Sequence, residues 1–296
     1  MLRSGAPMYL WCDGAHDPAE NMRRDAALLA AAERSPEIAP VLRLFRFAPH
    51  GITLGYAQHP DRELDLDCCR RAGVPWAVRP TGGRAIFHAE EWTYSLAARI
   101  DDPDWGGSLR EAYKAISELL VRSLIRLGVP ARSAPAASRS GIGERPASGP
   151  GATSGAGRGG EPACAAIGTG AQHAVAAPCF VSTARHEVVL DGRKLVGSAQ
   201  RRTARALLQQ GSLLLGTGHL RLVDYLAIDD SARAAARDLL NARASGAEAF
   251  LGDNPPLERW AAALTQELPG VRRIDDAAGL FLLTPPEPGF YTVAIR

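Results

Sequence analysis

The sequence of 296 residues predicts an α+β fold of mixed, mainly antiparallel sheets flanked by helices, with a small helical lobe at its C-terminal end. Runs of β-branched and aromatic residues, typical of strands, recur between residues 41 and 100. The dipeptide Asp191-Gly192, a strong hairpin signal, separates two further strand-like runs, so these strands are expected to pair antiparallel. Apolar residues return to helical spacing after Leu220, which predicts the C-terminal helices.

The first element expected along the chain is a helix at 18–34. Asp17 and Pro18 suit a helix start, and Met22 and Leu29 belong to an apolar set at helical spacing. Further elements before residue 130 are expected as strands at 41–47, 51–56, 76–79 and 92–100, a short helix at 61–72 and a long amphipathic helix at 109–127.

Residues 131–177 consist mainly of Ala, Gly, Ser, Pro and Arg, with hardly any large apolar side chain. Such a segment buries too little apolar surface to offset the conformational entropy lost on ordering, so we expect a mobile low-complexity insertion. Because strand-like patterns resume directly after it, the insertion is placed inside one catalytic domain, residues 1–219, and a small C-terminal lobe, residues 220–296, follows. The later elements are expected at 186–190, 194–201, 206–215, 230–240 and 256–268, ahead of a short strand-like tail.

Composition argues against several classes of function. The net charge is +2, from 34 basic and 32 acidic residues, and no basic face stands out, so no nucleic-acid partner is expected. No apolar run approaches the roughly 20 residues of a membrane helix, and the N-terminus lacks a signal-peptide pattern. Five cysteines without CxxC or zinc spacing indicate free thiols in a reducing cytoplasm and no metal site.

A glycine pair with cationic neighbours is the first candidate binding element. Gly82 and Gly83 lie between Arg79 and Arg84, and His88 follows on the next segment. Glycine lets the backbone approach a ligand closely, and the neighbouring cations suit an anion or a polarised carbonyl. The segment lacks the patterns of a P-loop and of a dinucleotide-binding turn, so neither type of nucleotide site is indicated.

Cys179 and Lys194 are the second candidate element. A thiolate is a nucleophile, and an ammonium beside it favours the ionised thiol and stabilises the oxyanion that forms when a thioester is attacked. The pair therefore suits transfer of an acyl group through a thioester. The other cysteines are interpreted as small buried hydrophobic residues or as part of the insertion: Cys12, Cys68, Cys69 and Cys164.

Three segments together resemble the superfamily of lipoate-protein ligases, octanoyltransferases and biotin ligases, and they occur in the family's order. They are RPTGGRAIFH at 79–88, PCF at 178–180 and DGRKLVGSAQRR at 191–202. The resemblance runs from about Asp17 to Leu215, outside the insertion, and implies the biotin/lipoate protein ligase catalytic fold. It is closest to the octanoyltransferases that use a cysteine, because Cys179 lies just before the hairpin that carries Lys194.

The resemblance implies an acyltransferase of protein lipoylation. It would move octanoate from octanoyl-acyl carrier protein to Cys179, and then to a lysine of a lipoyl domain, with the glycine cleavage H protein as a candidate acceptor. No cofactor is implied, Lys194 would act with Cys179, and Ile86, Phe87 and Val196 would line a channel for the acyl chain. The substrate-binding residues implied are Arg79, Thr81, Gly82, Gly83, Arg84, His88, Gly197, Ser198 and Gln200.

Three alternatives stay open. In an ATP-dependent lipoate-protein ligase, which uses ATP and magnesium, Cys179 would be incidental and Lys194 would contact an acyl-adenylate. A lipoyl-domain amidotransferase would again use a cysteine, and a degenerate member would bind carrier domains without catalysis. The last is suggested by two departures from the family pattern, Ala89 where an acidic residue is usual and Gln210 where histidine is usual.

Overall fold

The computed structural model describes residues 7–134 and 186–275. Cys179, Cys164 and almost all of the insertion expected at 131–177 lie outside the described residues. The nucleophile and the mobility of the insertion therefore stay predictions.

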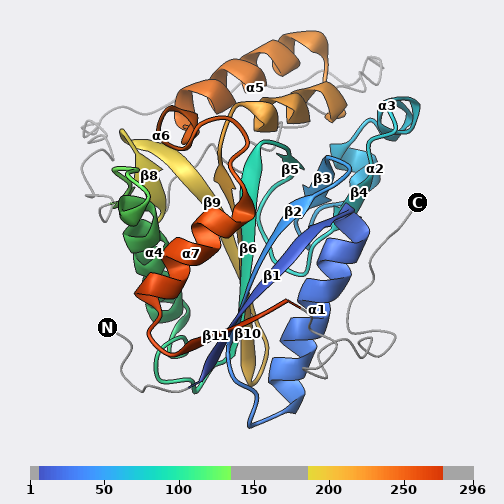
Figure 1. Ribbon diagram of the computed structural model, residues 1–296. Helices are drawn as coiled ribbons and strands as arrows, with labels where there is room; N and C mark the ends of the chain where they lie inside the picture. The colour runs from blue at the N-terminus through green and yellow to red at the C-terminus, as the bar shows by residue number, and fades with distance from the viewer. Residues whose placement is uncertain (1–6, 135–185, 276–296) are drawn as a thin grey trace, which may run out of the picture.

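Two sheets form the framework of the molecule (Figure 1). In the main sheet β11, β1 and β2 run parallel, and the remaining strands pair antiparallel. In spatial order its strands are β11 (Val271–Ile274), β1 (Met8–His16), β2 (Val41–Phe47), β6 (Glu91–Arg99), β10 (Ala206–Leu214), β9 (Arg193–Arg202), β8 (Val188–Leu190) and β7 (Arg132–Ser133). The small sheet has the order β4 (Trp76–Val78), β3 (Gly51–Leu54) and β5 (Ile86–His88).

Helices cover both faces of the main sheet. Figure 1 shows α1 (Pro18–Arg34) along one face, and α4 (Leu109–Arg126) with α7 (Leu257–Glu267) across the other. The shorter elements are α2 (Pro60–Glu63), α3 (Leu66–Arg71), the 3-10 helix η1 (Gly218–Tyr225), α5 (Asp230–Arg243) and α6 (Glu248–Leu251).

The helix starts follow from their capping residues. The Asp17 carboxylate accepts a hydrogen bond from the Glu20 N–H at 2.9 Å, so α1 begins where the sequence predicts. Ser108 and Glu111 form a capping box that starts α4. The segment expected as one helix at 61–72 is instead two short helices, because buried Leu64 bridges to Leu226 and Asp65 caps a new helix.

Strand alternation divides the central strands into two faces. Trp92 and Tyr94 of β6 belong to the apolar core under α4 and α7, where the rings of Trp92 and Trp260 stack with centroids 5.5 Å apart. Thr93 and Ser95, one residue along in each case, point to the α1 face because successive strand residues alternate. The α1 face is therefore the polar side of the central sheet.

The residues expected as a C-terminal lobe lie in two places. Helix α7 packs on α4 and β1, and its Trp260 and Leu264 belong to the core of the main sheet. Strand β11 pairs parallel with β1, a strand that the sequence patterns missed. Helix α5 lies instead against η1 and β9. The main core thus draws on residues from both sides of the expected boundary at residue 219, and the division into two domains stays a prediction.

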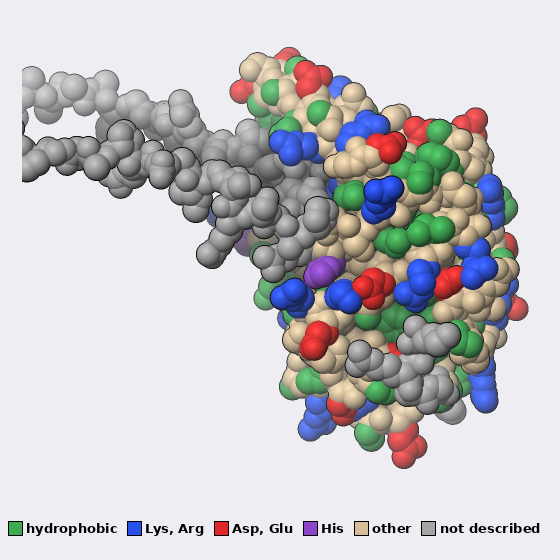
Figure 2. Space-filling model, turned by 90° about the vertical axis from the view of Figure 1, so that its left-hand side faces the viewer, with side chains coloured by type: hydrophobic (Ala, Val, Ile, Leu, Met, Phe, Trp, Pro, Cys, Tyr) green, Lys and Arg blue, Asp and Glu red, His purple; other side chains and the backbone are tan. Residues whose placement is uncertain are grey.

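Basic and acidic side chains are interspersed on the face shown in Figure 2. Among the described residues, no helix is long and apolar enough to cross a membrane.

Candidate functional site

A narrow cavity lies where the small sheet meets the α1 face of the main sheet. It is lined by Met22, Phe45, Phe47, Thr53, Arg79, Ile86, His88, Thr93, Gly197, Ser198, Ala199, Gln210, Gly211 and Ser212. Four of the residues implied by the family resemblance are thus in one place, since Arg79, His88, Gly197 and Ser198 all line it. The cavity is small, about 30 Å³, so side chains in its wall would have to move before an acyl chain could enter.

The glycine turn stands at the edge of this cavity and is held by Arg79. The Arg79 guanidinium donates from Nη2 to the carbonyls of Gly82 and Arg84, each at 2.8 Å. Gly83 has φ +95, and a Cβ on Gly55 would lie 2.1 Å from the Gly83 carbonyl oxygen, so both positions require glycine. Arg79 therefore holds the turn in place through hydrogen bonds to its carbonyls. The Arg84 side chain is exposed.

A chain of side-chain hydrogen bonds joins the turn to helix α1. Thr81 donates from Oγ1 to Gln210 Oε1 at 2.7 Å, and Gln210 donates from Nε2 to the Asp25 carboxylate. Asp25 also accepts from Arg43 at 2.7 Å and from Ser95 at 2.6 Å. Asp25 and Arg43 are fully buried, so this is a desolvated ion pair whose orientation is fixed by hydrogen bonds. The pair orients the Gln210 amide and, through it, Thr81.

His88 lines the cavity and is held on both ring nitrogens. Its Nδ1 is 2.6 Å from Glu91 Oε1, its Nε2 is 2.7 Å from Thr53 Oγ1, and the Phe47 ring stacks on it at 3.8 Å. The sequence lacks the acidic residue that is usual after the histidine, but the structure supplies a carboxylate from Glu91, three residues along. The departure at Ala89 therefore does not deprive His88 of an acidic partner.

Lys194 and Gln200 are not among the described residues that line the cavity. The Lys194 ammonium is buried and lies 2.7 Å from Glu187 Oε1. Gln200 donates from its side-chain amide to Gln209 Oε1 at 3.0 Å. Ser198 reaches the cavity but its hydroxyl bonds the Tyr94 hydroxyl at 2.8 Å. Whether Lys194 approaches Cys179 stays a prediction, since Cys179 lies outside the described residues.

Of the three residues expected to line an acyl channel, two do not line the cavity. Ile86 lines the cavity, as expected. Phe87 points to the opposite side of β5, where its ring stacks on Tyr225 with centroids 5.6 Å apart. Val196 packs in the core under α4 and α7. For Phe87 the reason is strand alternation, which sends neighbouring residues of β5 to opposite faces.

Several cavity residues were missed by the sequence patterns: Met22, Phe45, Phe47, Thr53, Thr93, Gln210 and Ser212. A usable signal is present in β10, where Gln209, Gln210 and Ser212 interrupt an otherwise apolar strand that is buried throughout. Polar residues inside such a strand indicate a buried hydrogen-bonded network, and Gln210 and Ser212, two residues apart, lie on one face of it.

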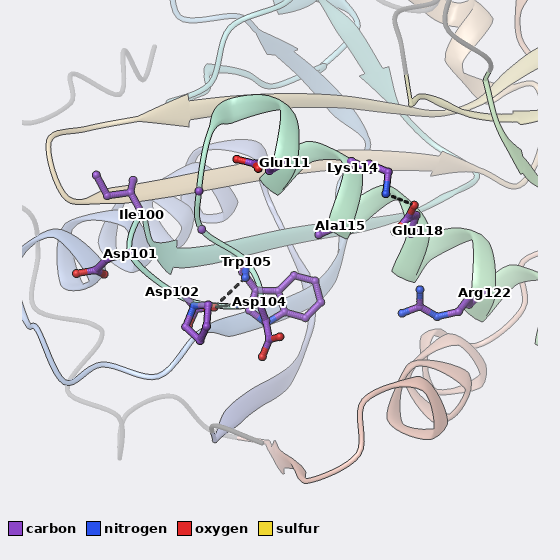
Figure 3. Close-up of a pocket in the computed structure, with 13 residues that line it drawn as sticks. Ile100, Asp101, Asp102, Asp104, Trp105, Glu111, Lys114, Ala115, Glu118 and Arg122 are labelled. Carbon is purple, nitrogen blue, oxygen red and sulfur yellow. Dashed lines mark hydrogen bonds and ion pairs between the residues drawn. The ribbon is translucent and has the colours of Figure 1, made fainter. Parts of the chain in front are cut away.

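A larger groove of about 510 Å³ lies at the start of α4 and is separate from this cavity (Figure 3). The Asp102 carboxylate accepts from the N–H groups of Asp104 and Trp105, and Lys114 pairs with Glu118 at 2.7 Å. Burial raises the pKa of Asp102, and this is offset in part by those two backbone hydrogen bonds. These contacts account for the carboxylates as turn and helix-surface groups, so the groove is not assigned a function.

Residues 17–269 match the family described as the lipoyl protein ligase A/B catalytic domain. The chain belongs to this family. This member of the lipoyl protein ligase A/B family also resembles curated relatives named Octanoyltransferase LipM. It is 38% identical to the one from Kyrpidia tusciae over 68% of this chain and 64% of the relative. It is 31% identical to the one from an Exiguobacterium species over 81% of this chain and 78% of the relative. The match spans less than two thirds of the length of the relatives from Kyrpidia tusciae and Moorella thermoacetica.

Solved structures confirm the fold of this family member. A bi-partite lipoate protein ligase from Thermoplasma acidophilum, studied with its E2 lipoyl domain, is similar with a TM-score of 0.61 and 20% identity, covering 92% of this chain and 87% of that chain. Lipoate-protein ligase A bound with ATP gives a TM-score of 0.61 and 19% identity, covering 92% and 89%. The expected α+β catalytic fold of mixed sheets flanked by helices is therefore confirmed.

Proposed function

We propose that this chain is an octanoyltransferase that moves octanoate from octanoyl-acyl carrier protein through a Cys179 thioester to a lysine of a lipoyl domain. The observation that carries the proposal is that the curated relatives described above are octanoyltransferases, at identities up to 38%. The similar ligase structures are no more than 20% identical to this chain and so favour the fold without favouring ATP-dependent chemistry.

The proposed reaction has two acyl transfers. In the first, the Cys179 thiolate attacks the octanoyl thioester of the carrier protein, the carrier thiol leaves, and an octanoyl-enzyme thioester forms. In the second, the ε-amine of the acceptor lysine attacks that thioester, a new amide bond forms, and the Cys179 thiol is released. Neither transfer needs ATP, magnesium or another cofactor, because the donor is already a thioester.

The described site offers a place for the acyl group. Met22, Phe45 and Ile86 supply apolar wall, and Met22 has the flexible side chain needed to open a narrow cavity. Each CH₂ of the chain that becomes buried is worth about 0.8 kcal/mol, so an eight-carbon chain supplies much of the affinity. The glycine turn is tied to this cavity by Arg79 and by the bond from Thr81 to Gln210, since Arg79 and Gln210 both line it.

The test is to incubate the protein with octanoyl-acyl carrier protein and measure its intact mass. We expect a gain of one octanoyl group, sensitive to hydroxylamine, that is absent from Cys179→Ala. Cys69→Ala is the matched control and should keep the adduct, because Cys69 is buried in the core around β3, β5 and η1.

The second arm adds an acceptor. With apo glycine cleavage H protein or another apo lipoyl domain, the octanoyl group should move to the acceptor without ATP. Modification that requires ATP and free octanoate, with no adduct on the enzyme, would identify a ligase instead. Octanoyl or lipoyl transfer that starts only from an already modified lipoyl domain would identify an amidotransferase. Binding of the carrier domain with no transfer under any condition would identify a non-catalytic member.

A further inference from the structure

We propose that Phe45 is a fixed stop at the closed end of the narrow cavity and that Met22 is its movable wall, so that these two side chains set the length of the acyl chain that the protein accepts. The proposal rests on the function proposed above and adds chain-length selection to that same site. It is carried by the direction in which the cavity runs, by the contacts that hold Phe45 and by the freedom of Met22.

The cavity runs across the main sheet from β9 to β2. Its lining includes residues of four neighbouring strands, β9, β10, β6 and β2, in that spatial order. Ser198 and Ala199 on β9 are half-buried, and every other described residue of the lining is buried. The open end is therefore at β9, the strand that carries Lys194, and the closed end is at β2, where Phe45 packs with Met22.

The span between these ends suits a chain of medium length. Neighbouring strands lie about 4.8 Å apart, so the three spacings from β9 to β2 amount to about 14 Å. An extended eight-carbon acyl group is of comparable length. The glycine turn stands at the open end, since a Cβ on Gly83 would lie 3.9 Å from the Ala199 Cβ. The acyl carbonyl is therefore assigned to the β9 end and the terminal methyl group to the β2 end.

Phe45 is held rigidly at the closed end. It is fully buried, and its ring centroid lies 3.8 Å from the Arg43 guanidinium carbon and 5.6 Å from the Phe47 ring centroid. Arg43 is also fully buried, and its guanidinium is fixed by hydrogen bonds to Asp13 and Asp25 at 2.7 Å each. The Phe45 ring cannot turn aside without losing its contact with this desolvated cation, so it acts as a stop.

Met22 is the side chain at the closed end that can move. It is 2% exposed and belongs to a small apolar cluster with Phe45, Phe47 and Ala77. A methionine side chain is unbranched and adapts its shape to what packs against it. The Met22 sulfur lies 3.5 Å from Gln210 Nε2, and a thioether is only a weak acceptor. Displacement of Met22 therefore opens the space of about 30 Å³, while Phe45 keeps its depth fixed.

The fixed stop selects length because it limits how many CH₂ groups find apolar contact. Each buried CH₂ is worth about a factor of four in affinity, so an octanoyl group is favoured over a hexanoyl group by about 15-fold. A methylene that a hydrophobic pocket cannot place costs about 10-fold or more. A decanoyl group, longer by two carbons, is therefore rejected at Phe45.

The test compares donors of four lengths. The value of kcat/KM for transfer to an apo lipoyl domain is measured with hexanoyl-, octanoyl-, decanoyl- and dodecanoyl-acyl carrier protein, and the unaltered protein should prefer octanoyl. Phe45→Leu shortens the stop, so the ratio of the decanoyl to the octanoyl value should rise by about 15-fold, the worth of two buried CH₂ groups. Phe45→Met keeps more apolar bulk and should shift the ratio in the same direction.

Two further variants separate the roles of the stop and the wall from a loss of stability. Leucine is close to methionine in volume but branched, so Met22→Leu should lower kcat/KM for every donor by up to about 10-fold and leave octanoyl preferred. Leu29 lies on the same helix, is fully buried and packs in another cluster. Leu29→Ala should therefore lower the unfolding temperature and leave the donor ratios unchanged. Thermal unfolding of each variant shows that it is folded at the assay temperature.

Binding of free octanoate and decanoate, measured by calorimetry, needs no acyl transfer and gives a second readout. Phe45→Leu should raise the affinity for decanoate relative to octanoate. Unchanged donor ratios in folded Phe45→Leu and Phe45→Met, or an equal shift in Leu29→Ala, would overturn the stop and leave the octanoyltransferase proposal intact. A changed order of donors in Met22→Leu would overturn the assignment of Met22 as wall. The expected shift in fatty-acid binding by a protein that transfers nothing would retain the stop and remove the octanoyltransferase proposal.

Discussion

The two faces of strands β6 and β10 carry opposite chemistry, although one alternating backbone builds both. The face under α4 and α7 is a close-packed apolar core around Trp92 and Trp260. The face toward α1 buries a connected set of polar side chains that includes Asp25, Arg43 and Gln210. Buried polar groups add little to stability and are costly when unpaired, so their concentration on one face marks where binding and chemistry are organised.

The largest expected effect comes from removing a large side chain from the core on the apolar face. Trp260 is fully buried, and Trp260→Ala should lower the free energy of unfolding by about 3–5 kcal/mol. The octanoyl transfer rate per folded molecule should stay unchanged, because Trp260 is not among the described residues that line the cavity. Urea unfolding gives the first quantity, and single-turnover transfer below the unfolding midpoint gives the second. A strong loss of rate in the folded fraction would show that the two faces are coupled.

The polar face should respond differently. Asp25→Asn removes one of the two carboxylate charges that Arg43 faces, the other being that of Asp13, and should lower the free energy of unfolding by about 1.5–3 kcal/mol. Here transfer should also fall, because Asp25 orients Gln210 and thereby Thr81. Urea unfolding and single-turnover transfer on the same samples check both. Loss of stability with full transfer would contradict a positioning role for this network.

Local signals in the sequence predict the local parts of this structure. Asp17 and Ser108 start α1 and α4 as their capping preferences dictate, and Asp191-Gly192 turns the β8–β9 hairpin. Strand β1 was missed because it pairs parallel with β2 and β11, so no short turn connects it to either partner. Parallel neighbours joined by long connections leave little trace in a local pattern.

The site shows the same division between local and distant contacts. The glycine turn was predicted because it is one short segment, but Thr81 and Gln210 are brought together across 129 positions of sequence. Asp25 and Gln210 meet across 185 positions. A partner so distant can be found only once the sheet register is known. Arg79 was expected as a ligand-binding cation, and its role in holding the turn depends on carbonyls whose direction the sequence does not reveal.

Gln210 offers a smaller and more selective change on the polar face. Gln210→Leu leaves Thr81 and Asp25 each without one hydrogen bond and should lower the free energy of unfolding by about 1–3 kcal/mol. The expected main result is a higher KM for octanoyl-acyl carrier protein, since the glycine turn is held less firmly. Gln210→His introduces the residue usual in the family, whose neutral ring has one donor and one acceptor nitrogen. Its KM should lie between that of the unaltered protein and that of Gln210→Leu. Equal KM values in all three proteins would show that the hydrogen bond between Thr81 and Gln210 is unimportant for substrate binding.

The smallest expected effect concerns the outer side of α1, which faces solvent and not the site. The hydrogen bond from Arg23, aided by Arg24, lowers the pKa of Glu20 from 4.5 to about 2. Because the folded-state value lies below the unfolded one, Glu20 contributes stability above pH 4.5 that is lost as the pH falls toward 2. The Glu20 side chain is partly exposed, so solvent screening keeps this contribution under what the shift alone implies. Urea unfolding at pH 6 and pH 3 should therefore show a slightly shallower pH dependence in Glu20→Gln than in the unaltered protein, with the transfer rate at pH 7 unchanged. A steeper dependence would reverse the assigned sign, and a change in transfer rate would extend the polar network of the site to the solvent side of α1.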